Sequence, residues 1–310
     1  MTDRSMTTAA ALPEPSAAPP PRATRPLYWS IRREIWENPS FYVAPLFVAG
    51  LVLVGCVISL SYLPHIVPLV ASQTPEKRMA ALSSPYAFAA ISIAITSFIV
   101  GAFYCLGALH GERRDRTILF WKSLPISDLT AVLAKAAIPL AILPVITFVV
   151  TVVLMLIVLG LNAVGLAVNG FSTAPLVTEL PLFNMILVLA YGLVVLALWH
   201  APIYAYLLLV SAWARRTTFL WAVLPPIALG LVERIAFDTH YVGALIRYRL
   251  FGGFAEAFHV KSARAAFSHD LLSQIDPAGF LMTPGLWLGL IAAGAFLAAA
   301  VWLRRYREPI

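Results

Sequence analysis

The chain has 310 residues, of which 60% are apolar and only 12% are charged, and its mean hydropathy is +0.84. Ordinary soluble domains are about half apolar and about one quarter charged, so this composition excludes a water-soluble fold of this length. The net charge of +7 is compatible with nucleic-acid binding, but the basic residues lie between apolar runs and form no stripe, which argues against such a partner. Cys56 and Cys105 lie inside apolar runs and build neither a disulfide framework nor a zinc motif.

The first 25 residues predict a disordered tail, because they are rich in Ala, Pro, Ser and Thr and their prolines interrupt any helix. A secretory signal needs an uninterrupted apolar core of about 7 to 15 residues, which this stretch lacks. We therefore expect no secretory signal in it.

Six apolar segments are long enough to cross a membrane. A helix rises about 1.5 Å per residue, so it needs around 20 mostly apolar residues to span a hydrocarbon core of about 30 Å. The fold class predicted is therefore all-α, a polytopic membrane protein with six transmembrane helices. Internal Pro139, Pro144 and Pro202 are expected to kink the third and fourth spans. The predicted spans are residues 41–63, 86–110, 131–161, 182–211, 217–235 and 284–303.

The orientation follows from the basic residues of the connections, since Lys and Arg near span ends stay on the cytoplasmic side. The third connection, 162–181, has neither, and the first has only Lys77 and Arg78. The fifth connection is too long for its basic residues to count strongly. We therefore expect both termini in the cytoplasm. The basic residues of that side are Arg4, Arg22, Arg25, Arg32, Arg33, Arg113, Arg114, Arg116, Lys122, Arg215, Arg216, Arg304, Arg305 and Arg307.

Residues 26–38 predict a helix before the first span, because Pro26 suits a helix start and the side chains separate by face. We expect it to lie flat at the inner membrane interface, with its aromatic rings at headgroup depth. A plain cytosolic helix is the alternative. The apolar face holds Leu27, Tyr28, Trp29, Ile31, Ile35 and Trp36, and the polar face holds Ser30, Arg33, Glu34 and Glu37.

The fifth connection, 236–283, is too long for a simple turn and carries aromatic residues among polar ones. Glycines and prolines divide it into short pieces, which favours re-entrant or interfacial helices that touch the outer leaflet. An irregular solvated loop is the alternative.

The segment 111–130 is the most informative connection, because it is charged and yet neither Gly-rich nor Pro-rich. Residues 117–124 are apolar and aromatic enough to pack against another surface, and Ser127 with Asp128 resembles the N-cap of the next helix. An apolar patch ringed by Arg and Lys is a candidate docking surface for a soluble partner. Ordinary basic topology signals are the alternative.

A recurring order of residues runs through this connection: Glu112 at the end of a span, a basic stretch, Thr117, the turn Ser-Leu-Pro-Ile-Ser at 123–127, and then Lys135. This pattern resembles the permease subunits of ABC-2 type transporters. The resemblance extends to an interfacial "elbow" helix before the first span, six spans, a long outer connection and a basic tail. The chain departs from the commonest pattern at Arg116, where Gly is frequent, and at 120–122, where small or aliphatic residues are frequent.

The resemblance implies that 111–130 contains a coupling helix, which receives force from a separate ATPase subunit. It implies two permease subunits, identical or paired, that work with two ATPases as an exporter in the lipid of a bacterial inner (cytoplasmic) membrane. ATP and Mg would then be held by the partner, and this chain would hold no cofactor or metal. The implied ATPase-coupling residues are Glu112, Arg113, Arg116, Thr117, Phe120, Trp121, Lys122, Ser123 and Pro125.

The sequence carries no motif that would make the chain an enzyme. No Lys follows a glycine, so a phosphate-binding Gly-Lys-Ser/Thr loop is absent. HExxH, GxSxG and paired carboxylates within the spans are absent as well. We expect ATP hydrolysis in a partner and none in this chain.

His200 is the polar residue of most interest inside a span, because burying such a group unpaired costs several kcal/mol. With Tyr204 and Asn184 it is a candidate for the translocation path. A His hydrogen-bonded to a neighbouring helix is the alternative. A proton-coupled secondary transporter using His200, and a non-transporting membrane scaffold or assembly protein, are the alternative functions. The cargo stays open among lipids, hydrophobic drugs, peptides and ions.

Overall fold

The computed structural model describes residues 25–115, 126–258 and 275–306. These residues form an all-helical protein, and no β-strand occurs in those three ranges. Nearly all of the predicted disordered tail lies outside them. The helices are α1 (Pro26–Glu37), α2 (Ser40–Leu60), α3 (Leu63–Ala71), α4 (Pro75–Arg114), α6 (Asp128–Ala137), η1 (Ile138–Ile142), α7 (Leu143–Val168), α8 (Ala174–Thr178), α9 (Leu182–Trp213), α10 (Thr218–Phe237), α11 (Tyr241–Ala257), α12 (Pro277–Met282) and α13 (Pro284–Tyr306).

Six helical runs are long and apolar enough to cross a membrane, which confirms the predicted number of spans. They are α2, α4, the continuous run α6–η1–α7, α9, α10 and α13. Several are longer than their apolar cores. In α4, Pro75 lies in the first turn with Glu76, and Arg113 and Arg114 lie in the last turn. A proline start, an acid at the N-terminal end and bases at the C-terminal end all stabilise a helix that continues beyond the apolar stretch.

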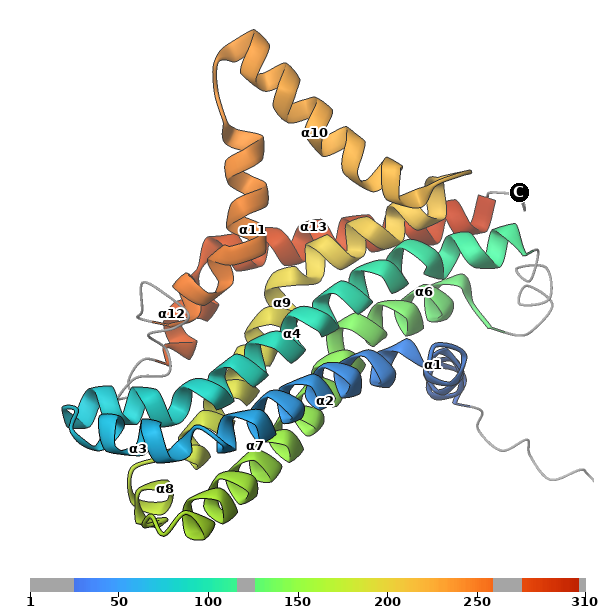
Figure 1. Cartoon of the computed structure of the whole chain (residues 1–310). Coiled ribbons are helices and arrows are strands. Elements are labelled where there is room, and N and C mark those ends of the chain that lie inside the picture. The colour runs from blue at the N-terminus through green and yellow to red at the C-terminus, as the bar shows by residue number, and fades with distance from the viewer. Residues whose placement is uncertain (1–24, 116–125, 259–274, 307–310) are drawn as a thin grey trace, which may run out of the picture.

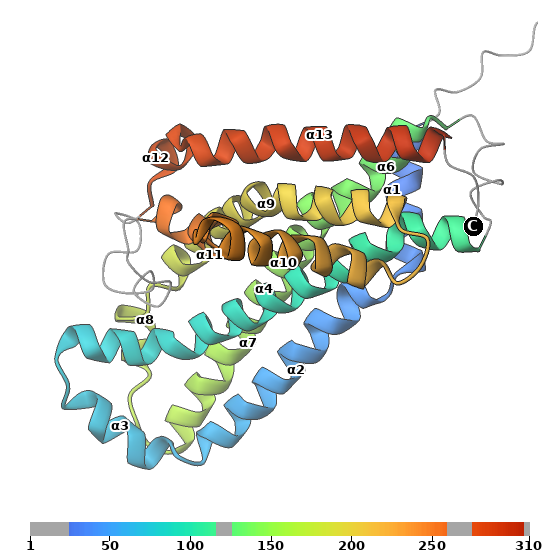
Figure 2. The same ribbon diagram turned by 90° about the horizontal axis from the view of Figure 1, so that it is seen from above.

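The bundle is organised around α9, which packs against α4 and α13, while α2 packs against α4 and α7. Figure 2 shows α3, α8 and α12 at one end of the bundle, and α1, α6 and the last turns of α4 and α13 at the other. We call the second of these the α1 end. The first described helix and the end of the last one therefore lie at the same end.

A π-helical turn, η1, interrupts the third span where prolines predict a kink. Proline has no N–H to donate, and its ring clashes with the carbonyl group four residues earlier. Pro144 would meet the carbonyl of Leu140 in this way, and the wider π turn accommodates the ring. Such turns are common at functional sites. Pro139 within this turn and Pro144 just after it line a cavity described below.

Helices α10 and α11 form an arm that leaves the bundle and returns to it (Figure 1). Almost all of α10 is exposed, and Ala222 is its buried residue. At the far end of the arm, the Glu233 carboxylate accepts hydrogen bonds from the Thr239 hydroxyl and the Val242 N–H, both at 2.8 Å. Glu233 thus caps the start of α11, which then runs back and packs against α9.

Helix α1 turns a mixed face toward the bundle, on which Ile31 and Ile35 pack against the core beside Glu34. Glu34 is buried, whereas the rings of Tyr28, Trp29 and Trp36 are exposed. The covered side of α1 therefore mixes residues of both predicted faces, and Glu37 of the predicted polar face is about half exposed. A buried carboxylate requires partners, and Glu34 has two, Lys135 and Tyr104.

Candidate functional site

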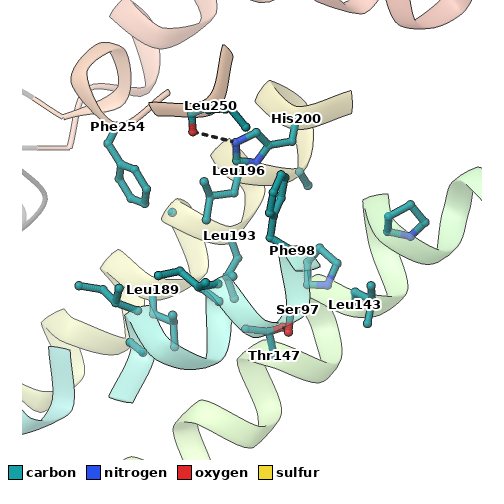
Figure 3. A pocket seen from close by; sticks show the side chains of 18 of the residues that line it. Ser97, Phe98, Leu143, Thr147, Leu189, Leu193, Leu196, His200, Leu250 and Phe254 are labelled. Carbon is teal, nitrogen blue, oxygen red and sulfur yellow. Dashed lines mark hydrogen bonds between the residues drawn. The ribbon is translucent and has the colours of Figure 1, made fainter. Parts of the chain in front are cut away.

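A cavity of about 410 Å³ lies inside the bundle, between α4, the η1–α7 turn, α9 and α11. Small-molecule sites have volumes of about 300–1,000 Å³ and form preferentially between helices in proteins of this kind. Figure 3 shows side chains from these elements converging on it, among them Phe98 of α4, Leu143 of α7, Leu193 of α9 and Phe254 of α11. The cavity is therefore large enough for a small organic molecule.

Three of the polar side chains on the cavity wall, Ser97, Thr147 and His200, bind one another or the backbone. The hydroxyl groups of Ser97 and Thr147 are hydrogen-bonded, with 2.5 Å between their oxygens, and both residues are buried. The Nε2 atom of His200 lies 3.2 Å from the carbonyl oxygen of Leu250 and, because a carbonyl only accepts, donates its proton to it (Figure 3). The His200 ring also packs against Phe98, with 4.8 Å between the ring centroids.

Two of the three predicted path residues meet at this cavity. His200 and Tyr204 line it from α9, one helical turn apart. Asn184 lies half-buried near the start of α9 and is absent from the described residues of the wall. The bond from His200 to Leu250 also matches the alternative interpretation of a histidine satisfied by a neighbouring helix, so this residue holds α11 and lines the cavity at the same time.

Sequence reasoning missed the walls contributed by α4, α7 and α11. Ser97 and Thr147 are small polar residues in apolar runs, and nothing in their local pattern indicates that they face each other. The one sequence signal they offered was a hydroxyl group within a predicted span. Burial of such a group costs free energy unless it forms a hydrogen bond, so each needed a partner. The wall from α11 depends on the return of the α10–α11 arm, which no local pattern specifies.

A second site, which we call the charge cluster, lies at the α1 end. Lys135 of α6 contacts Glu34 at 2.7 Å and Glu112 at 3.1 Å, between amine nitrogen and carboxylate oxygen. Arg304 of α13 forms ion pairs with Glu112 and with Asp128, the latter at 3.0 Å. Lys135, Glu112 and Arg304 are buried. The cluster therefore joins α1, α4, α6 and α13 through charged side chains that are shielded from water and paired with one another.

Two further residues extend the charge cluster. The Tyr104 hydroxyl donates to Glu34 at 2.7 Å. Arg33, at the edge, approaches Glu112 at 3.9 Å and binds Glu37 at 2.6 Å. Burial acts to lower the pKa of Arg33, but its hydrogen bond to Glu37 and the surrounding carboxylate charges outweigh burial and raise that pKa. Arg33 therefore stays a cation at every physiological pH.

The predicted ATPase-coupling residues divide into those the structure describes and those outside it. Glu112 belongs to the charge cluster. Arg113 is only 4% exposed and donates from Nη1 to the Ala212 carbonyl at 2.7 Å, so within this chain it binds the end of α9. The others, which lie outside the described residues, are Arg116, Thr117, Phe120, Trp121, Lys122, Ser123 and Pro125.

A helix cap and an ion pair hold the residues on either side of 116–125. Ser127 caps α6, as its place in the sequence predicts, because its hydroxyl accepts the Thr130 N–H at 3.1 Å. On either side of residues 116–125, Glu112 of α4 and Lys135 of α6 form the ion pair given above. The two helices that enter and leave the segment are therefore tied to each other.

The described residues contain no group of three or more His, Cys, Asp or Glu side chains that could hold a metal ion. The two candidate sites are thus an apolar cavity and a set of ion pairs. Comparison with protein-family models, with curated proteins and with solved structures found no match to this chain.

Proposed function

We propose that this chain is the membrane-spanning permease subunit of an ATP-driven ABC exporter, which forms the substrate pathway and couples to a separate ATPase subunit. The observation that carries the proposal is the cavity of about 410 Å³ enclosed by three long apolar helices and the return of the α10–α11 arm. A membrane scaffold has no need of such a space. The sequence resemblance supplies the energy source and the direction.

The charge cluster supports a mechanical role for the 111–130 connection. Helix α4 is continuous from Pro75 to Arg114, so Glu112 is joined to Phe98, on the cavity wall, by about 21 Å of rigid helix. A force applied by a partner to the segment after α4 would move α4 together with α6, because Glu112 and Lys135 hold them. The expected consequence is a change in the shape of the cavity. In this arrangement the α1 end is cytoplasmic.

Recovery of the partner tests the proposal most directly. The chain, tagged at its C-terminus and expressed at its natural level, should copurify from detergent-solubilised membranes with an ATPase subunit in equal amount and with a second permease chain. Vanadate, which traps ATPase turnover, should stop export. Purification of the chain without any ATPase in stoichiometric amount would contradict the proposal and favour the scaffold.

Substitutions in the candidate docking surface, residues 117–124, test whether ATP hydrolysis in the partner is coupled to export through this segment. Trp121→Ala combined with Lys122→Glu should lower export by about tenfold while ATP hydrolysis continues, because a buried Trp at an interface commonly contributes that much. The matched control is Trp287→Ala with Lys77→Glu, which changes an exposed Trp and an exposed Lys at the other end of the bundle. Export and hydrolysis are measured together in proteoliposomes. Equal effects of the two pairs would remove the support for this docking segment.

His200 favours a second candidate, a proton-coupled carrier, because it is a titratable side chain on the cavity wall. His200→Gln keeps a side-chain N–H that can reach the Leu250 carbonyl but cannot carry a proton through the pathway. Under our proposal ATP-driven export should fall by less than about tenfold, the cost of one altered hydrogen bond. The control is His110→Gln, since His110 binds the Ala214 carbonyl outside the cavity. Complete loss of export in His200→Gln alone would establish the proton-coupled carrier instead.

A further inference from the structure

The wall of the cavity is almost entirely hydrocarbon. Among the described residues that line it, none carries a charged side chain, and the polar ones are Ser97, Thr147, His200 and Tyr204. Ser97 and Thr147 are bonded to each other, and His200 is bonded to the Leu250 carbonyl. These hydrogen bonds are already formed within the protein, so a ligand would meet an apolar surface with few donors or acceptors to spare.

The cavity has an open side between α4 and α11. Ile95 of α4 and Phe251 of α11 belong to its lining and are nevertheless 55% and 72% exposed. Ile95 lies in a helix that is apolar enough to cross a membrane, and Phe251 is itself a large apolar side chain. The opening is therefore edged by apolar side chains. A molecule that reaches the cavity through it comes sideways, along the surface of the bundle.

Arg249 precedes the wall residue Leu250, and its Nη1 atom is buried without a hydrogen-bond partner among the described residues. Its guanidinium group lies over the Trp199 ring, 4.9 Å from the centroid, and donates to the Gly285 carbonyl of α13. It is absent from the cavity wall as described. Among the described residues of the wall, an anionic ligand would therefore find no counter-ion, and a cationic ligand would find no carboxylate.

We infer that the cavity binds an uncharged molecule with a hydrocarbon body, which enters from the side between α4 and α11. Its identity as the exported cargo rests on the proposed function. Its uncharged, apolar character rests on the composition of the cavity wall. A carboxylate or ammonium group would lose its hydration in the cavity without gaining an ion partner, which is the costliest exchange available in an apolar site. A hydrocarbon chain loses nothing there and gains close contacts.

Photolabelling of the full chain in phospholipid nanodiscs tests the inference. The probes are a long-chain primary alcohol with a diazirine near its end, and the carboxylic acid and the quaternary ammonium salt of the same chain at a pH where both are charged. The alcohol should label the wall segments of α4 and α9 in a saturable manner, as read by peptide mass spectrometry. Labelling of the wall by a charged probe as strong as that by the alcohol would overturn the inference.

A glycine pair provides the matched control. Gly192 is buried on the wall, where an added Cβ would lie 3.9 Å from the Phe258 ring, whereas Gly160 is exposed with nothing within 4 Å. Gly192→Leu should lower wall labelling by the alcohol about tenfold, because four added carbon atoms occupy space that the ligand needs. Gly160→Leu should leave it unchanged. Ala197→Leu, on the same wall, serves if Gly192→Leu does not fold. Wall labelling that stays unchanged in both Gly192→Leu and Ala197→Leu would overturn the inference.

The hydrocarbon has two possible sources, an acyl chain of a bilayer phospholipid and a separate apolar molecule. A phospholipid with the diazirine at the end of one acyl chain separates them. Displacement of this lipid from the wall by added unlabelled alcohol supports a separate uncharged molecule. Resistance to displacement would show that the occupant is the acyl chain of a charged phospholipid and would overturn the inference. The assay contains no ATPase, so its failure leaves the exporter proposal standing. Failure to recover an ATPase partner would overturn the exporter and leave the binding result intact.

Discussion

Glu112→Ala is expected to lower the thermal unfolding midpoint of this protein by roughly 10 °C, the equivalent of about 3–5 kcal/mol for a chain of this size. The reason is the burial of its partners. Lys135 and Arg304 have side chains that are only 4% and 5% exposed, and both form ion pairs with Glu112. Removal of the carboxylate leaves two buried cations that share the remaining acids, and uncompensated buried charge is strongly destabilising.

The measurement is thermal unfolding in detergent, followed by intrinsic fluorescence. The matched control is Glu37→Ala, because Glu37 also pairs with an arginine but is about half exposed. Its midpoint should stay within about 1 °C of the parent, since exposed ion pairs contribute little. Similar midpoints for the two variants would mean that the charge cluster does not hold α1, α4, α6 and α13 together. It would also remove the mechanical link between the 111–130 connection and the cavity.

Gly253→Leu is expected to detach α11 from α9 and to open the cavity. Gly253 is buried against the indole of Trp199, and an added Cβ would lie 2.8 Å from its Cγ atom. Trp199 is fully buried and cannot retreat. Overpacking of this kind costs about 1–3 kcal/mol, which lowers the unfolding midpoint by roughly 5 °C. The bonds from Trp199 to the Tyr248 carbonyl, at 3.3 Å, and from His200 to Leu250 should break with it.

The comparison is with Gly243→Leu, which makes the same change on the same helix, where nothing lies within 4 Å of the added Cβ. Thermal unfolding and photolabelling of the cavity wall by the alcohol probe are read for both variants. Gly253→Leu alone should lose saturable labelling, because Leu250, Phe251 and Phe254 of α11 form one wall. Loss of labelling in both variants, or in neither, would show that the docking of α11 on Trp199 does not shape the cavity.

These expectations connect the two candidate sites. The charge cluster sits at the α1 end, where α4 leaves the bundle toward the 111–130 connection, and the cavity lies farther along the same α4 helix. Ion pairs make the first site rigid, and apolar contacts with a few backbone bonds hold the second. A push at the α1 end would therefore be transmitted through α4 and absorbed where α11 packs against α9.

Much of the fold was predictable from the sequence. The number of spans depends on apolar length alone, because backbone groups in hydrocarbon must be satisfied within a helix. The start of α6 was predictable as well, since Ser127 followed by Asp128 is a local capping signal that its Thr130 N–H bond confirms. The extent of α4 was underestimated, because its first turns, with Glu76, Lys77 and Arg78, carry no hydropathy signal. The third span continues past residue 161 through the mostly apolar residues 162–168.

The candidate sites were predictable only in part. His200 stood out because a polar residue inside an apolar run requires a partner, but the sequence did not identify that partner as the Leu250 carbonyl. Glu34 was assigned to the polar face of an amphipathic helix. The structure buries it, because Lys135 and Tyr104 meet it there from residues far along the chain.

The sequence by itself determined that this chain is helical and has six segments long and apolar enough to cross a membrane, because hydrophobicity and helix length are local properties. Only the tertiary structure decided that α11 returns to form one wall of a cavity, that Ser97 faces Thr147, and that Glu34, Glu112, Lys135 and Arg304 share one buried cluster. Each of these features joins residues on different helices. Which helix faces meet is set by side-chain packing and by the pairing of buried polar groups, and neither is written in any one segment of the sequence.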